Sequence, residues 1–186
     1  PLIEDGSEAH GARLEGRPAG SFGRCAVFSF RGEKVLAGAQ MGGVVTDDPA
    51  LAERVRYYAE NGLPFPNRLR YSSTGPGLNL LCSNLHAALA LAQLHRADEL
   101  IAARRRVHAG WRDALGAMPG LSFQAPHGDP IWWLTAIRIG PAFTRLDPRD
   151  LAAALAEAGV ETRPGFTPLS WMPHLERGDE TPVADA

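Results

Sequence analysis

Lysine is almost absent from this chain of 186 residues. Of its 19 basic side chains, 18 are arginines, and Lys34 is the single lysine. An arginine guanidinium stays protonated, whereas a lysine amine can lose its proton and attack a carbonyl carbon where its surroundings favour this. The single lysine is therefore either a surface residue kept by chance or a residue whose chemistry arginine cannot replace.

Three further absences restrict the class of protein. The two cysteines, Cys25 and Cys82, cannot form a disulfide framework and lie in apolar contexts, which predicts a reducing, cytoplasmic location. No apolar run approaches about 20 residues, so we expect no transmembrane helix and no membrane partner. A net charge of −2 gives no strong positive field, so we expect no nucleic acid partner.

Hydrophobic periodicity predicts an α/β protein. Asp48 and Ser83 are typical capping residues at helix starts, and short apolar runs predict strands. The helix after Ser83 is apolar on nearly every side, so we expect it to be buried. A Pro- and Gly-rich loop is expected at 63–79, where its length favours a functional role or disorder. The predicted strands are 2–5, 25–30, 42–46, 121–125, 131–139 and 160–163, and the predicted helices are 49–60, 84–94, 96–115 and 148–158.

The residues around Lys34 could serve pyridoxal 5′-phosphate (PLP). A lysine that binds the PLP aldehyde needs a carboxylate for the ring nitrogen and donors for the phosphate. Asp5 ends a predicted buried strand, where a carboxylate needs either such a partner or a turn to cap. Ser29, five residues before Lys34, is a candidate phosphate ligand. Glycines on both sides of Lys34 allow tight turns and close approach of a ligand.

Three ordered motifs resemble the PLP-dependent sugar aminotransferases of the DegT/DnrJ/StrS type. The first runs from IEDGSEAHGA to GSFGRCAVFSFRGEK at 3–34. The second is GLNLLCSNLHAALALAQL at 77–94, and the third is AGVETRPGFTPLSWMP at 158–173. The third looks most like enzymes that act on 4-keto-6-deoxy sugars.

The resemblance implies an α/β fold of the aspartate-aminotransferase-like, fold-type I class. Residues 1–110 would form the C-terminal part of the large, mixed-sheet PLP-binding domain with its linking helix. Residues 111–186 would form part of the smaller C-terminal α/β domain. Family members are about twice as long as this chain, which does not begin with Met, so we expect it to be a fragment.

The resemblance also implies roles for five residues. Lys34 would bind PLP covalently and later carry the proton during amino transfer. Asp5 would pair with the pyridine nitrogen, Glu8 would lie near the ring hydroxyl, and Ser29 would bind the phosphate. Asn79 would reach the phosphate of the neighbouring subunit, which implies a homodimer with shared active sites.

The implied reaction transfers an amino group, from glutamate, to a nucleotide-linked keto sugar in polysaccharide or antibiotic sugar biosynthesis. Lys34 argues against the family's dehydratase branch, which carries His at this position. An alternative is a PLP-binding regulator or subunit partner without transaminase activity, and a cofactor-free lysine aldolase ranks last. The histidines lack metal-ligand spacing, so no metal is expected. The sequence departs from the family pattern at Arg24, Gln40, Met41 and Leu81, which puts the substrate in doubt more than the cofactor.

Overall fold

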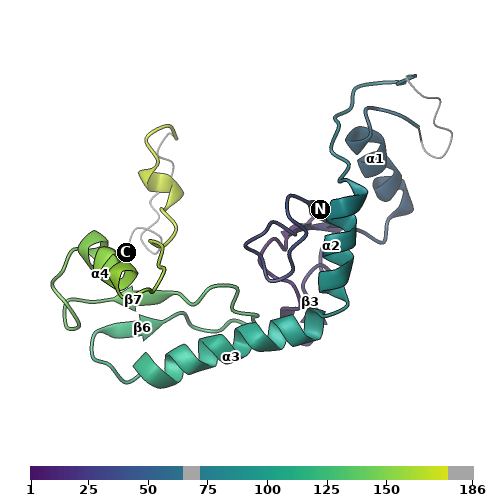
Figure 1. The fold of residues 1–186 in the computed structure, drawn as a ribbon. Helices are drawn as coiled ribbons and strands as arrows, with labels where there is room; N and C mark the ends of the chain where they lie inside the picture. The colour runs from purple at the N-terminus through teal and green to yellow at the C-terminus, as the bar shows by residue number, and fades with distance from the viewer. Residues whose placement is uncertain (65–71, 176–186) are drawn as a thin grey trace. The chain divides into compact units, whose positions relative to one another are not determined.

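The computed structural model describes residues 1–64 and 72–175. Two compact units are present (Figure 1). The first holds Pro1–Ala117 and Phe123–Thr135, and the second holds Met118–Ser122 and the described residues from Ala136 onward. Part of the predicted 63–79 loop, residues 65–71, lies outside the described residues. The assignment of 1–110 and 111–186 to a large and a small domain stays a prediction.

A three-stranded mixed sheet organises the first unit. Its strands are β1 (Ile3–Asp5), β4 (Cys25–Ser29) and β5 (Gly42–Val45), in the order β1-β4-β5. β1 pairs with β4 in parallel, so their carboxyl ends lie at the same edge, with Asp5 opposite Val27. Since side chains alternate along a strand, Ser29 lies on the same face as Val27 and Asp5. This confirms the three strands predicted at 2–5, 25–30 and 42–46.

Lys34 lies on the loop that joins β4 to the antiparallel strand β5. Backbone hydrogen bonds from Phe30 N to the Met41 carbonyl (2.9 Å) and from Gly38 N to the Phe30 carbonyl (2.6 Å) close the loop. Gly38 is required there, because an added Cβ would lie 2.8 Å from the Met41 sulfur and 2.9 Å from the Ala90 Cβ. Val35 and Leu36, directly after Lys34, are among the few apolar side chains that are buried in the described part of the chain.

Two of the three helices described in the first unit begin at the caps that the sequence predicts. The three helices are α1 (Pro49–Ala59), capped by Asp48, α2 (Asn84–Leu94), capped by Ser83, and α3 (Ala97–Leu115). None of the helices in the described residues is long and apolar enough to cross a membrane.

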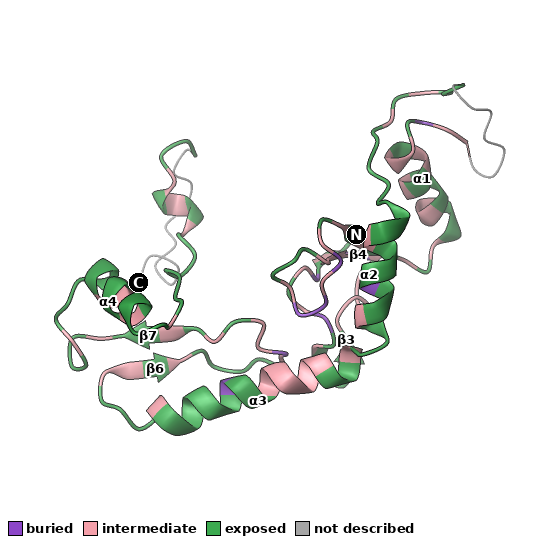
Figure 2. Cartoon of the chain, in the orientation of Figure 1, coloured by how far each residue is buried: buried purple, intermediate pink, exposed green. Residues whose placement is uncertain are grey.

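The prediction that α2 is buried is wrong for the described residues. Only Ala90 is buried on this helix, and its leucines are exposed (Figure 2). Ala90 is covered because it lies against Gly38 of the Lys34 loop. An apolar sequence shows that a helix can be buried, but a covering element must also be present.

A short β-ladder and a bridging segment complete the first unit. β2 (Arg13–Leu14) pairs with β3 (Arg17–Pro18), and Arg13 also forms an isolated bridge with Asp129.

The second unit carries less regular structure than predicted. A two-stranded sheet pairs β6 (Leu121–Phe123) with β7 (Ile137–Ile139), and α4 (Pro148–Glu157) and the short 3-10 helix η1 (Leu169–Trp171) follow. The strand predicted at 131–139 forms only at its end, because Trp132 adopts a φ of 55°, which breaks an extended strand. The strand predicted at 160–163 does not form.

Glu4 fixes the turn that leads into β4. Its carboxylate accepts backbone N–H bonds from Gly20 (2.7 Å), Phe22 (2.6 Å) and Gly23 (2.6 Å). Burial alone would raise the pKa of Glu4, but these bonds and the nearby Arg17 charge outweigh it and lower the pKa. The ionised Glu4 carboxylate in β1 therefore holds in place the turn that directly precedes the neighbouring strand β4.

Replacement of this carboxylate should destabilise the protein. We expect Glu4→Gln to lower the free energy of unfolding by about 1–3 kcal/mol, because the amide places an NH2 group against backbone donors. Thermal or urea unfolding at neutral pH measures this loss, with Glu53→Gln on the exposed side of α1 as the control. Equal stabilities of the two variants would contradict the role assigned to Glu4.

Candidate active site

The Lys34 amine is held between a carboxylate and an aromatic ring. Its Nζ atom donates to Oε1 of Glu8 at 3.0 Å and lies 3.8 Å from the ring centroid of Trp133. The Lys34 side chain is 10% exposed, whereas that of Glu8 is 45% exposed. An ammonium this far removed from water needs such partners, since a buried unpaired charge is costly.

Asp5 supplies a second carboxylate near this amine. Its Oδ1 accepts the backbone N–H of Ser7 at 3.0 Å. Hydrogen bonding from Ser7 lowers the pKa of Asp5, and the Lys34 charge lowers it further. The turn-capping role considered for Asp5 is therefore present, and a carboxylate, with about four acceptor sites, can accept a further bond from a ligand.

Ser29 and Asn79 lie in different settings. Ser29 shares the strand face of Asp5, and its Oγ accepts the Arg31 N–H at 3.4 Å, which leaves the hydroxyl proton available to donate. Asn79 is exposed and forms an isolated backbone bridge with Glu60 next to α1. The described residues thus bring Lys34 and Glu8 into contact, with Asp5 and Ser29 on one nearby edge, and they do not show Asn79 joining them.

His10 is buried beside this group without a polar partner. It is 5% exposed, and its ring packs against Phe28 at 5.4 Å and Phe30 at 5.1 Å between centroids. Neither ring nitrogen has a hydrogen-bond partner among the described residues. Burial lowers the pKa of His10, and the charge of Lys34 adds to this effect. The imidazole is therefore neutral at physiological pH and packs as an aromatic ring.

Trp133 is the site residue that the sequence analysis missed. Trp132 and Trp133 fall within the strand predicted at 131–139, but Trp133 covers the Lys34 amine. Its indole Nε1 also donates to the Glu33 carbonyl at 2.8 Å. The only sequence signal was the pair of tryptophans itself, which says nothing about a contact with a residue about 100 positions away.

The arrangement fits the chemical groups of PLP. A reactive aldehyde requires an amine, such as that of Lys34, and a pyridine nitrogen requires an ionised carboxylate, such as that of Asp5. The Ser29 hydroxyl, on the same sheet face as Asp5, is a donor for a phosphate. Among the described residues, no group of three or more His, Cys, Asp or Glu side chains could hold a metal ion.

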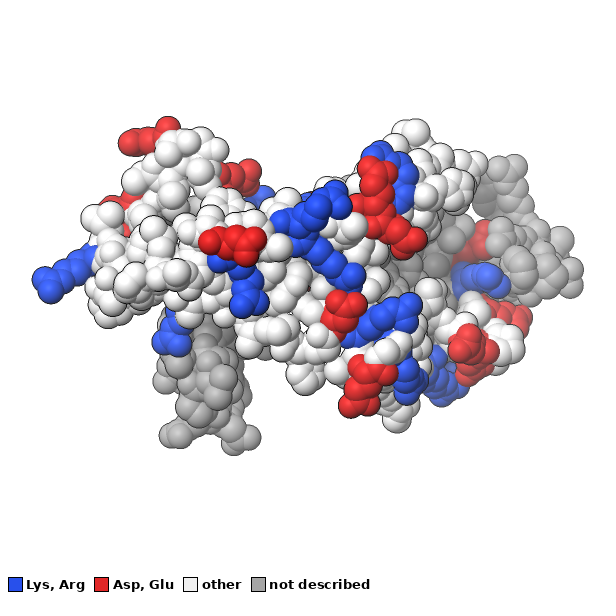
Figure 3. All heavy atoms as spheres, turned by 90° about the horizontal axis from the view of Figure 1, so that it is seen from below, with Lys and Arg blue, Asp and Glu red and all other residues white. Residues whose placement is uncertain are grey.

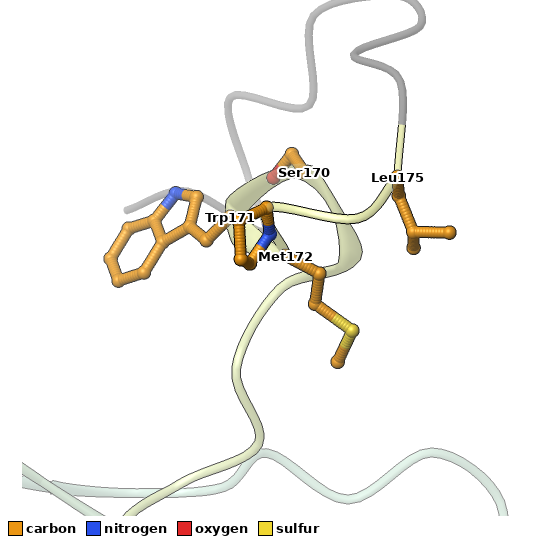
Figure 4. Close-up of a pocket in the computed structure, with 5 residues that line it drawn as sticks. Ser170, Trp171, Met172 and Leu175 are labelled. Atoms are coloured by element: carbon orange, nitrogen blue, oxygen red, sulfur yellow. The ribbon is translucent and has the colours of Figure 1, made fainter.

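Other surfaces offer less chemistry. Figure 3 shows basic and acidic side chains interspersed on the face in view, without a broad region of one sign. A pocket around η1 is lined by Ser170, Trp171, Met172, Pro173 and Leu175 (Figure 4). None of these five side chains titrates near neutral pH, so this pocket supplies no acid, base or charged ligand.

The departures from the family pattern have different local consequences. Arg24 pairs with Asp48, the cap of α1, at 2.8 Å, so its charge serves the scaffold. Met41 lies against Gly38 on the loop that carries Lys34. Gln40 and Leu81 are exposed.

The neutral His10 makes the stability depend on pH. Its lowered pKa means that the unfolded chain takes up a proton, as pH falls through about 6.5, before the folded chain does. The stability linked to His10 is therefore present above that pH and is lost toward its folded-state pKa. We expect the melting temperature to fall between pH 7.5 and 5.5, and to fall less in His10→Phe.

His95→Gln, which removes an exposed histidine, serves as the control for this measurement. An equal fall in wild type and His10→Phe would show that folding does not lower the pKa of His10. His108 has a pKa lowered by burial and by the Arg112 charge, so some pH dependence should remain in His10→Phe.

Known proteins similar to this chain include a GDP-perosamine synthase and an aminotransferase. The GDP-perosamine synthase of Caulobacter vibrioides is 38% identical over 193 residues, covering all of this chain and 50% of that protein. The aminotransferase TlmJ from Streptoalloteichus hindustanus superposes with a TM-score of 0.86 at 25% identity, over 100% of this chain and 50% of that one. DesV of S. venezuelae gives 0.76 at 32% identity, over 92% and 44%.

The chain thus spans about half the length of the relatives it matches. The aminotransferase fold expected from the sequence is confirmed by these structures. The sequence profile of the DegT/DnrJ/EryC1/StrS aminotransferase family matches residues 1–186. The chain belongs to the DegT/DnrJ/EryC1/StrS aminotransferase family.

Proposed function

We propose that the protein carrying this chain is a PLP-dependent aminotransferase that acts on a nucleotide-linked keto sugar. The observation that carries the proposal is the Lys34 amine, held by Glu8 at 3.0 Å beside the ionised Asp5. PLP, when bound, supplies an electron-withdrawing ring that allows an amino group to be exchanged between carbon skeletons. The residues of this chain supply attachment, orientation and proton transfer.

Each residue has a separate task in this proposal. With PLP bound, the Lys34 amine would hold the cofactor through its aldehyde carbon and, when released by an amino donor, would hold and return the proton at the reacting carbon. Asp5, as an ionised carboxylate, would keep a proton on the ring nitrogen. Glu8 would orient the Lys34 amine beside the ring hydroxyl, and Ser29 would donate to the phosphate.

The sugar substrate is proposed from the relatives. The names of two of them, GDP-perosamine synthase and dTDP-3-amino-3,4,6-trideoxy-alpha-D-glucose transaminase, describe amino sugars linked to nucleotides. We propose glutamate as the amino donor and the cytoplasm as the location. A panel of GDP- and dTDP-linked keto sugars, assayed for 2-oxoglutarate formed from glutamate, identifies the substrate.

Removal of the amine should abolish cofactor attachment. We expect the wild-type protein to show the visible absorbance of lysine-bound PLP, and Lys34→Ala to lose it. Lys34→Arg is the matched control, because it keeps a positive charge between Glu8 and Trp133 but cannot form the bond. A visible band that persists in folded Lys34→Arg protein would overturn the assignment.

The addition of glutamate distinguishes a transaminase from the alternative, a PLP-binding regulator without transaminase activity. Added to the PLP-loaded protein, glutamate should remove the visible band and release 2-oxoglutarate. If PLP stays bound and neither change occurs, the regulator proposal replaces the enzyme.

We also propose that two copies form a dimer in which Asn79 serves the site of its partner. The exposed setting of Asn79 supports this proposal, as do its exposed neighbours Leu78, Leu80 and Leu81. Such a dimer has shared, symmetric sites, so two defective chains can complement one another.

Mixing inactive chains tests the shared site. Lys34→Ala and Asn79→Ala should each have little activity. After unfolding and refolding together they should recover about a quarter of wild-type activity, because about half of the dimers are mixed and each mixed dimer has one intact site. No recovery in an otherwise correctly assembled dimer would place Asn79 within its own subunit's site or outside both.

A further inference from the structure

We propose that Trp133 is a positioning residue that holds the Lys34 amine in place before the cofactor arrives. The use of a fixed amine for cofactor attachment rests on the proposed function. The contact by which Trp133 fixes the Lys34 amine does not. The indole face lies 3.8 Å from Nζ, within the range in which a ring attracts a cation. The lysine stem is flexible, and fixing it in advance reduces the entropy lost on reaction.

The ring is also tied to the loop that it covers. The indole Nε1 donates to the carbonyl of Glu33, the residue before Lys34, at 2.8 Å. The Lys34 backbone N–H in turn bonds to the Arg31 carbonyl at 2.9 Å. One side chain therefore contacts both the backbone before the lysine and the charged end of its side chain.

A strap formed by residues 129–135 holds Trp133 at this point. At its start, Asp129 exchanges two backbone hydrogen bonds with Arg13, of 2.7 and 3.0 Å. The Asp129 carboxylate also pairs with Arg105 of α3 at 2.9 Å. Ile131, two residues further on, is 2% exposed. The beginning of the strap is thus fixed to β2 and α3 independently of Lys34.

The other anchor of the strap is a stacked ring pair. Trp132 stacks on His108 of α3, with centroids 3.8 Å apart and planes 4° from parallel. His108 Nδ1 also lies 3.2 Å from the Thr135 hydroxyl. Trp132 has a φ of 55°, a conformation that costs a bulky residue energy and needs compensating contacts. The break in the backbone lets one tryptophan contact α3 and its neighbour contact the Lys34 loop.

Glu8 alone does not explain this arrangement. The Glu8 carboxylate, 3.0 Å from the Lys34 Nζ atom, already compensates the charge of Lys34. The Glu8 side chain is half-exposed, however, so packing does not fix its position. The indole face lies over the charged end of the Lys34 side chain. The structure therefore predicts that loss of the ring face, rather than loss of the indole N–H, frees the amine.

Two substitutions at this position separate the ring face from the hydrogen bond. Trp133→Phe keeps a ring face and loses the bond to Glu33, and Trp133→Leu loses both. Trp111→Leu, on the exposed side of α3, is the control for loss of a tryptophan. The protein carrying this chain is labelled with lysine enriched in 13C at Cε, and the Lys34 signal is assigned by its loss in Lys34→Ala.

The cofactor-free protein is measured first. Protons above an aromatic ring resonate upfield, so we expect an upfield Lys34 Hε signal in wild type, Trp133→Phe and Trp111→Leu. The signal should return to the position of exposed lysines in Trp133→Leu. PLP is then added, and the rate at which its lysine-bound absorbance forms is followed. We expect a loss of about tenfold in Trp133→Leu and a change within about twofold in Trp133→Phe.

Each result has a definite meaning. An ordinary Lys34 signal in wild type overturns the inference, as does equal PLP attachment by wild type and Trp133→Leu. Equal losses in the Phe and Leu variants would assign the effect to the Glu33 hydrogen bond and overturn the role of the ring face. If wild type attaches no PLP, the proposed function fails, while the Lys34 signal still decides whether Trp133 positions the amine.

Discussion

The interaction on which this site depends is the pairing of one nearly buried ammonium with two different partners. Water reaches little of the Lys34 side chain, so its charge must be compensated by the protein. Glu8 supplies the opposite charge, and Trp133 supplies a polarisable ring face. The amine and its two partners come from the β4–β5 loop, the turn after β1 and a segment after α3. All three must be in place before the amine has a defined position.

The scaffold explains how distant residues reach that position. Parallel pairing of β1 and β4 places Asp5 and Ser29 at one edge, and Glu4 fixes the connecting turn through three backbone hydrogen bonds. Gly38 then lets the loop from Lys34 return tightly past Ala90 to β5. The polar group in β1 is tolerated because its bonds outweigh the cost of its burial. The same short strand thus supplies a structural carboxylate and, at the next residue, a candidate cofactor ligand.

The sequence predicted the candidate site residues that lie close to one another along the chain. The grouping of Asp5, Ser29 and Lys34 follows from two short strands and a glycine-rich turn, all within one continuous stretch of chain. Trp133 could not be found in this way, because the largely apolar run 131–139 fits a strand and the left-handed φ of Trp132 leaves no mark in such a run. The exposure of α2 was missed for a related reason, since periodicity reports which face is apolar but not what covers it.

The departures from the family pattern can be ranked by the same reasoning. The Arg24–Asp48 pair is partly exposed and contributes little energy, so its main effect is to fix the start of α1 against the turn before β4. Met41, in contrast, contacts the loop that carries Lys34. Its sulfur lies against Gly38, in the loop that sets the backbone path after Lys34, and its carbonyl closes that loop by accepting the Phe30 N–H. A change at Met41 therefore acts on the same loop that Trp133 contacts at Glu33, whereas a change at Arg24 acts on the start of α1.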